Sequence, residues 1–433
     1  MQPVRRALLF LFPLAILLSN AVKIPLGGTS LSLSFPFTAA AALLLLITTL
    51  AGERRPTLYL PAALPLLGYL VVAIVSALKS SSGSAMSFGN AGAVPYLLFS
   101  LVCFLSFLNL IRDRGDLEAS VAGLLAAGLI QVSLGLFAFL AHGATGKDLG
   151  TATLIDNKPA FAQFMLPVVL LALAKLRTTG LARPFWLVIM PAAAMLFVVV
   201  ISRAAILGLV GAAALLYGRT ARFWVTGGLV VGAAIALVIW KPEMFSETLY
   251  YSLRSFDIRF VMAHPEIPEV TSFYLRAAIF LLGFRLLMKS PLWGIGPGTF
   301  GERISNLPKP PFIGPNETLT NKAESGYFNA LVESGFLGVL LLVIFFGTVA
   351  VHLLKTARRI VNPEDRALQE ALSLSAVSLF LMNFAQESFT TTFSWWLLAL
   401  ALAGARVLGG HVAETRATER RAPAAGRVAP CGC

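Results

Sequence analysis

Long, continuous apolar runs alternate with short polar connections along the chain. A run of about 20 apolar residues crosses a hydrocarbon core, and roughly twelve runs approach that length. They cover about residues 7–22, 35–50, 58–78, 93–111, 117–141, 159–174, 184–201, 204–217, 222–240, 336–354, 369–385 and 393–408. Because the runs are rich in Leu and Ala and do not alternate with polar residues, they favour helices over barrel strands. The pattern predicts an all-α, polytopic integral membrane protein with about 12 transmembrane helices.

One long polar interval, residues 241–335, interrupts this pattern. Within it, residues 271–289 predict an amphipathic helix at the membrane interface, since the segment is apolar but carries Arg276, Arg285 and Lys289. At about 100° per residue, Arg285 and Lys289 share one face, whereas Arg276 lies on the other side and is predicted to point into the protein.

Four regions follow from this division of the chain. We expect nine transmembrane helices in 1–240, a periplasmic loop domain in 241–335, three more transmembrane helices in 336–408 and a disordered cytoplasmic tail in 409–433.

The distribution of basic residues along the chain predicts how the helices are oriented in the membrane. Of 433 residues, 57% are hydrophobic and 13% are charged, which is far from the composition of a soluble domain. The net charge of +13 lies mainly in short connections, so it predicts orientation in the membrane and not nucleic-acid binding. Placing both termini in the cytoplasm and the 241–335 loop outside puts most basic connections on the cytoplasmic side. These connections contain Arg54, Arg55, Arg112, Arg114, Lys175, Arg177, Arg183, Arg219, Arg222, Lys355, Arg358, Arg359 and Arg366.

Two arginines at the predicted outer face are candidates for binding an anion. Arg203 lies between two apolar runs, where a charge costs about 2.5–3.5 kcal/mol on insertion scales unless it reaches water or a partner. It is either a turn residue that reaches the interface or a contact to an anionic group such as phosphate. Arg276 is either an interfacial anchor or a charge that meets a partner inside the protein.

Glu324 is the candidate acid–base residue. Asn321 and Glu324 have the spacing of the N-cap and N3 residues of a capping box, which by itself would explain the glutamate. The alternative is a general base that deprotonates a hydroxyl. The single histidines His142 and His264 lack the spacing of metal ligands, and we predict neither a metal nor a cofactor.

Four short motifs occur in order between residues 200 and 340. They are ISRAA at 201–205, PLWGIGPGTF at 291–300, AESGYF at 323–328 and VESGFLG at 332–338. The glycines of the second motif predict a tight turn and lack the context of a nucleotide-binding loop. The order of the motifs and their positions relative to the apolar runs resemble the O-antigen ligase and polymerase superfamily.

This resemblance implies a metal-independent, inverting glycosyltransferase of the bacterial inner (cytoplasmic) membrane. Its donor would be a glycan on undecaprenyl diphosphate, and its acceptor a second glycan or the lipid A core. By position, Arg203 and Arg276 correspond to family arginines that hold the donor diphosphate, and Glu324 stands where the family usually has a His base, in a pattern like Ala-His-Asn-x-Tyr-Leu. That departure favours the polymerase branch over the ligase branch.

Two other classes of protein fit the same pattern of spans. A transporter or flippase of lipid-linked sugars would show internal repeats and polar or broken helices near the bilayer midplane. A non-catalytic assembly partner would tolerate replacement of Arg203, Arg276 and Glu324.

Overall fold

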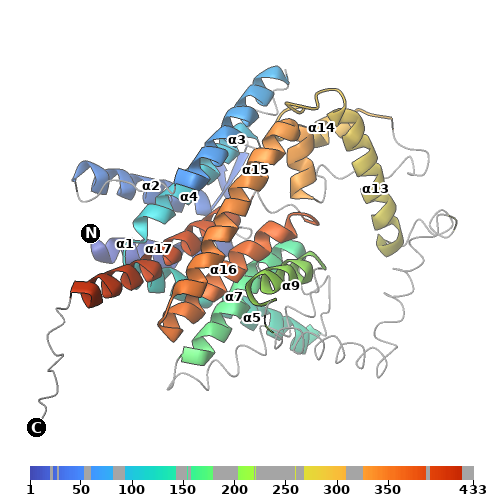
Figure 1. Cartoon of the computed structure of the whole chain (residues 1–433). Coiled ribbons are helices and arrows are strands. Elements are labelled where there is room, and N and C mark those ends of the chain that lie inside the picture. Colours follow the sequence, from blue (N-terminus) through green and yellow to red (C-terminus); the bar gives the residue numbers. More distant parts are fainter. Residues whose placement is uncertain are drawn as a thin grey trace, which may run out of the picture.

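The computed structural model of the whole chain describes residues 1–19, 23–26, 29–52, 60–80, 93–142, 154, 158–178, 203–218, 220, 259, 268–308, 325–386 and 391–421 (Figure 1). Its helices are α1 Gln2–Leu18, α2 Ser34–Leu50, α3 Leu60–Lys79, α4 Val94–Leu110, α5 Arg114–His142, α7 Lys158–Thr178, α9 Arg203–Tyr217, α13 Pro268–Leu287, α14 Phe300–Ser305, α15 Gly326–Arg359, α16 Pro363–Met382 and α17 Thr392–Arg421.

The predicted all-α class is confirmed in this part of the chain, apart from one small β-hairpin. Strands β1 (Lys23–Leu26) and β2 (Thr29–Ser32) pair antiparallel, with Lys23 opposite Ser32. The hairpin lies in the connection between the first two predicted spans. Its sequence signal is Gly27-Gly28 between two short runs, a pair of residues that suits a two-residue hairpin loop.

Several helices are long and apolar enough to cross a membrane, and the chain is a multi-pass membrane protein. Four contain a full-length span: Pro61–Lys79, Arg114–Ala138, Gly326–Arg359 and Thr392–Gly410. Shorter apolar helices occupy Ser34–Leu50, Val94–Leu110, Ala160–Leu176 and Ala204–Tyr217. The predicted spans 184–201 and 222–240 lie outside the described residues.

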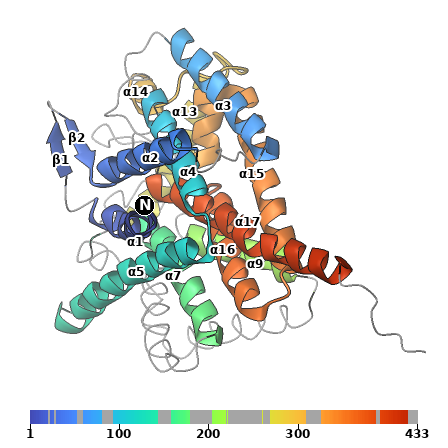
Figure 2. The ribbon, with the colours of Figure 1, turned by 90° about the vertical axis from the view of Figure 1, so that its left-hand side faces the viewer.

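The helices pack around a core of buried aromatic rings. Helix α3 runs beside α15, α17 lies against α4 and α16, and α16 also contacts α7 and α9 (Figure 2). Phe12 and Phe107 meet at 4.1 Å between ring centroids, and Trp396 lies 6.1 Å from Phe12. Because lipid tails are as apolar as these side chains, close packing contributes more to helix association in a membrane than the hydrophobic effect does.

Ion pairs join the ends of α1 and α5. The Nε of Arg5 donates to the carboxylate of Asp116 at 3.1 Å, and the Asp116 side chain has no exposed area. Asp113 pairs with Arg5 and with Arg6, each at 3.2 Å. Burial opposes ionisation of Asp113, but the backbone N–H of Asp116 and the side chain of Arg6 outweigh it, so the pKa of Asp113 lies below its usual value.

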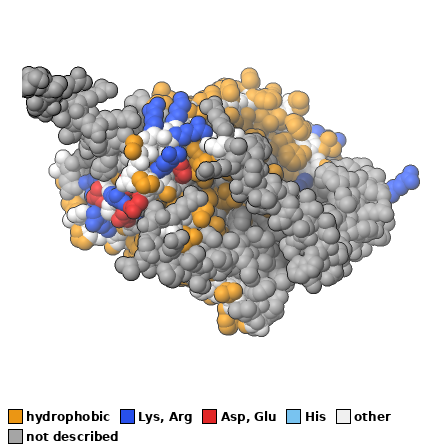
Figure 3. Space-filling model, turned by 60° about the horizontal axis from the view of Figure 1, so that its bottom comes forward, with side chains coloured by type: hydrophobic (Ala, Val, Ile, Leu, Met, Phe, Trp, Pro, Cys, Tyr) orange, Lys and Arg blue, Asp and Glu red, His pale blue; other side chains and the backbone are white. Residues whose placement is uncertain are grey.

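An arginine also binds the unpaired carbonyl groups at the C-terminal end of a neighbouring helix. The Nη2 of Arg406 in α17 donates to the carbonyls of Leu108 and Ile111 at 2.7 and 2.6 Å, just where α4 ends. Cations stabilise helix C-termini because the last carbonyl groups are unpaired and carry partial negative charge. In Figure 3, basic and acidic side chains gather on part of the surface beside broad hydrophobic areas. Arg114 also pairs with Asp365 at 3.3 Å, so Arg112, Arg114 and Arg366, which the charge pattern assigns to one side of the membrane, lie close to one another.

Removing Asp116, the buried partner of Arg5, should lower the stability of the folded protein. We expect Asp116→Ala to destabilise the protein by about 3–5 kcal/mol, since Arg5, whose side chain is 10% exposed, loses its buried counter-ion. The matched control is Glu118→Ala, which removes an exposed pair with Arg114 and should cost about 0.3–0.5 kcal/mol. Thermal unfolding in detergent compares the two variants. Equal losses of stability would contradict this role for Asp116.

Candidate active site

Helix α15 is broken at Gly335, whose φ of 70° and ψ of −174° are not helical. The break divides it into a first arm, 326–334, and a second arm, 336–359. The Tyr327 ring lies 6.4 Å from the Phe346 ring, although 19 residues of straight helix would separate them by about 28 Å. The first arm therefore folds back along the second (Figure 1), and the N-terminus of α15 lies beside the middle of the same helix.

The glycine-rich turn at residues 291–300 docks onto this break. Gly294, Gly296 and Gly298 have φ values of 75°, 109° and 72°, which confirms the predicted tight turn. Three backbone hydrogen bonds join the turn to α15: Ile295 N–H to Val332 at 3.0 Å, Gly296 N–H to Glu333 at 3.0 Å, and Phe336 N–H to Pro291 at 2.9 Å. The turn thereby satisfies backbone groups that the break removes from the helical pattern.

Two of the glycines are required by close approach of the backbones. A Cβ on Gly335 would lie 2.2 Å from the carbonyl oxygen of Leu292, and a Cβ on Gly294 would lie 2.3 Å from the carbonyl carbon of Glu333. Neither position has room for a side chain. Turn and break thus fit together as one unit, which we call the glycine clamp (residues 291–300 and 332–336).

Glu333 connects the glycine clamp to two further elements. Its side chain accepts a hydrogen bond from the Phe300 N–H at 3.2 Å, and its carbonyl accepts one from the Ser76 hydroxyl of α3 at 2.8 Å. The residue is only 7% exposed. Since these bonds hold α14 and α3 on the first arm, Glu333 has a positioning role that its sequence context alone does not reveal.

Two cations lie at the glycine clamp that sequence reasoning did not select. The Nζ of Lys79 lies 4.4 Å from the ring centroid of Trp293, and the Arg303 guanidinium donates to the carbonyl of Ser80. Both side chains sit at the C-terminal end of α3, where cations are favoured. Their positions in the sequence were the available signal: Lys79 directly follows the predicted span 58–78, and Arg303 lies three residues after the glycine-rich turn.

The N-cap of α15 is not the residue that the predicted capping box would require. The N-cap is Ser325, whose hydroxyl accepts a hydrogen bond from the Phe328 N–H at 3.3 Å. Glu324 therefore precedes the N-cap and is not the N3 residue, because Ser325 already supplies the capping oxygen. Asn321 and Glu324 themselves lie outside the described residues. Helix capping no longer explains the glutamate at 324.

The end of α16 holds this N-terminus in place. Backbone N–H groups of Gly326 and Tyr327 donate to the carbonyls of Gln386 and Asn383, both at 3.4 Å, and the Ser325 hydroxyl donates to Asn383 at 3.3 Å. The first N–H groups of a helix have no partner within it, so a neighbouring element must satisfy them. Here α16 does so.

Arg203, the first residue of α9, begins its helix at the same end of α16. At the far end of α9, the Tyr217 hydroxyl donates to Glu370 at 2.6 Å; nearer its start, a Cβ on Gly208 would lie 2.6 Å from the Ser378 carbonyl. The two helices are therefore antiparallel. Continuing this register places the backbone of Arg203 level with about residue 383, next to the carbonyls that hold α15. The structure does not describe the side chain of Arg203.

Arg276 lies on α13, which packs against the first arm. The Phe280 and Phe284 rings lie 4.3 and 5.2 Å from the Phe328 ring. Arg276 is one turn before Phe280 and is exposed, so the prediction that it points into the protein is wrong. Gly283, on the same side of the helix, is buried two turns further along, where α14 and α15 pack. Leu275 packs against the same buried cluster, so Arg276 lies at the edge of the buried side of α13.

Helices α9 and α13, which begin at and carry Arg203 and Arg276, thus lie near elements that pack around the first arm of α15. The N-termini of α9 and α15 share the end of α16, and α13 flanks the first arm of α15. Among the described residues there is no group of three or more His, Cys, Asp and Glu side chains able to hold a metal ion. Arg203 and Arg276 thus belong to helices near the first arm of α15, whereas the side chain of Arg203 and the whole of Glu324 lie outside the described residues.

Part of the chain matches a model of a known protein family. Residues 185–343 match the family model described as O-antigen ligase. The matched region contains Arg203, Arg276, Glu324 and the whole glycine clamp. No curated protein matches the chain.

Proposed function

We propose that the chain, whose residues 185–343 match the family model described as O-antigen ligase, is a metal-independent inverting glycosyltransferase of the O-antigen ligase and polymerase superfamily, with both termini in the cytoplasm. It acts at the periplasmic face of the bacterial inner membrane. Its donor is a glycan on undecaprenyl diphosphate, and its acceptor is a second glycan. The product is a longer O-antigen or exopolysaccharide chain.

The reaction is a single displacement. The acceptor hydroxyl attacks the anomeric carbon of the donor sugar while the bond from that carbon to the diphosphate oxygen breaks. Glu324 takes the hydroxyl proton, and undecaprenyl diphosphate leaves with inversion at the anomeric carbon. Arg203 and Arg276 stabilise the negative charge that develops on the diphosphate oxygens, which is the main electrostatic demand of this step.

One observation supports the proposal most strongly. Helix α9, which begins at Arg203, and the start of α15 both contact the end of α16, and α13, which carries the exposed Arg276, packs on the first arm of α15. These segments are separated by about 50 to 70 residues in the chain. Two cations and a carboxylate are the groups that a diphosphate donor and a hydroxyl acceptor require.

Chromosomal deletion followed by surface-glycan analysis tests the function. Accumulation of single lipid-linked repeat units supports a polymerase. The second candidate, a ligase to the lipid A core, is favoured by the description of the matched family. If the protein is a ligase, the deletion strain should contain intact free polymer that is not attached to the lipid A core. Purified protein that moves lipid-linked sugar across vesicles without forming a glycosidic bond would indicate a flippase and overturn the proposal.

Arg276 provides a direct test of the donor site. We expect Arg276→Ala to lower polymer formation by about 10²–10³-fold, the usual loss when one group that stabilises a developing oxyanion is removed. Arg285→Ala is the matched control, because Arg285 is also exposed on α13. Polymer length is measured in the deletion strain with equal amounts of each variant in the membrane. Full polymer with Arg276→Ala would contradict its role at the diphosphate.

A further inference from the structure

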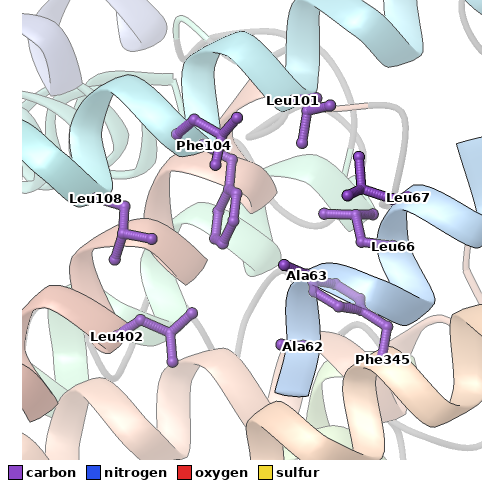
Figure 4. Close-up of a pocket in the computed structure, with 10 residues that line it drawn as sticks. Ala62, Ala63, Leu66, Leu67, Leu101, Phe104, Leu108, Phe345 and Leu402 are labelled. Atoms are coloured by element: carbon purple, nitrogen blue, oxygen red, sulfur yellow. The ribbon is translucent and has the colours of Figure 1, made fainter. Parts of the chain in front are cut away.

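A pocket of about 100 Å³ lies between four helices, away from the residues assigned above. Its wall is almost wholly hydrocarbon (Figure 4). The residues that matter for the argument are Ala62, Ala63 and Leu66 of α3, Phe104 of α4, Phe345 of α15 and Leu402 of α17.

The size and lining of the pocket suit a short piece of hydrocarbon. Apolar cavities of this order stay dry and take groups the size of benzene, because water finds no hydrogen-bond partners there. A five-carbon prenyl unit or a few methylene groups have similar bulk. A polar ligand would lose its hydration without compensation.

The pocket opens toward the outer surface of the helices. Leu67 lines it and is 48% exposed, and Leu64 and Val71 on the same helix are 65% and 58% exposed. Helix α3 contains one of the full-length candidate spans, so an exposed apolar side of it faces lipid. A chain from the bilayer therefore reaches the pocket without crossing a polar surface.

Aromatic contacts connect the pocket to the start of α15. Phe345 lies 6.4 Å from Phe104, its neighbour in the pocket wall, and 4.9 Å from Phe346. Phe346 in turn lies 6.4 Å from Tyr327, two residues after Ser325. The pocket and the N-terminus of α15 are thus separated by only two further ring contacts.

We propose that this pocket binds a segment of a lipid hydrocarbon chain and thereby supports the ring contacts behind the N-terminus of α15. The chain belongs either to the prenyl carrier of the donor, which rests on the proposed function, or to a phospholipid of the bilayer. In both cases the chemistry is the same: burial of methyl and methylene groups against Phe104 and Phe345.

Photolabelling of the full-length protein in phospholipid nanodiscs tests this site. One probe is a prenyl diphosphate with a diazirine in its chain, and the other is phosphatidylglycerol with a diazirine near the end of one acyl chain. We expect at least one probe to label pocket peptides of α3 or α4. In Ala63→Trp, whose indole occupies the pocket, labelling should fall about tenfold, equivalent to losing the burial of roughly two methylene groups.

Leu64→Trp is the matched control, because Leu64 is an exposed neighbour that does not line the pocket. It should leave labelling unchanged, and Ala63→Leu, a smaller change in case the Trp variant does not fold, should give an intermediate loss. Labelling by only one probe identifies the source of the chain. Labelling by neither probe, or equal labelling of Ala63→Trp and Leu64→Trp, overturns the proposal. Because labelling needs no turnover, the result does not depend on the chain being a polymerase.

Discussion

Glu324→Gln is expected to slow glycan transfer by about 10²–10⁴-fold while the protein stays folded, since general-base catalysis contributes a factor of this size. Glutamine keeps the shape of the side chain but cannot accept the proton. The measurement is initial rate with purified protein, lipid-linked donor and a defined acceptor. Ser325, which follows Glu324, caps α15 in its own right, so no loss of helix capping should accompany the substitution.

Two further variants make this prediction specific. Glu324→His restores a base of the type that the family usually carries, and it should regain part of the rate lost in Glu324→Gln. The acidic limb of its pH–rate profile should move toward about 6.5, the ordinary pKa of histidine. Glu302→Gln, at an exposed carboxylate of α14, should leave the rate unchanged. Wild-type turnover by Glu324→Gln would exclude Glu324 as the base.

Gly335→Ala is expected to have the largest effect on stability. The φ of 70° and ψ of −174° at this position belong to a region that only glycine occupies readily, and the added Cβ would meet the Leu292 carbonyl at 2.2 Å. Strain of about 1–3 kcal/mol and overpacking of similar size together predict a loss of about 2–6 kcal/mol. Glycan transfer should fall as well, because the first arm of α15 loses its position.

The same helix offers a matched control for this variant. A Cβ on Gly347 would meet no heavy atom within 4 Å. Gly347→Ala should therefore be neutral or stabilise the helix by up to about 1 kcal/mol, the difference between the helix propensities of the two residues. Thermal unfolding in detergent and glycan transfer are measured for both. A Gly335→Ala protein as stable as Gly347→Ala would show that the break is not required.

Several features were predictable because they depend on neighbours in the chain. Apolar runs long enough to span a bilayer predict helices wherever they occur, and the described part of the chain has them. The tight turn at 291–300 follows from Gly294, Gly296 and Gly298, since positive φ is a local property of glycine. The helix at Pro268–Leu287 follows from a mainly apolar segment before Pro291 that carries Arg276 and Arg285.

Other features depend on contacts between distant residues. The break at Gly335 exists because the turn at 291–300 supplies hydrogen bonds that the helix gives up there. Arg276 is exposed whereas Gly283, on the same side of α13, is buried, a difference that depends on what packs against the helix and that periodicity does not indicate. The role of Glu333 arises from Phe300 and Ser76, which lie 33 residues before it and 257 residues before it.

By itself, then, the sequence determined the membrane class, the places of most helices in the described residues, the tight turn and a resemblance that the family match over residues 185–343 supports. All of these depend on composition, short-range pattern or motif order. Only the tertiary structure decided that α15 folds back at Gly335, that Ser325 and not Asn321 caps it, and that the end of α16 brings the starts of α9 and α15 together. The physical reason is that backbone groups left unpaired at helix ends and breaks find their partners in whichever distant segment packs against them.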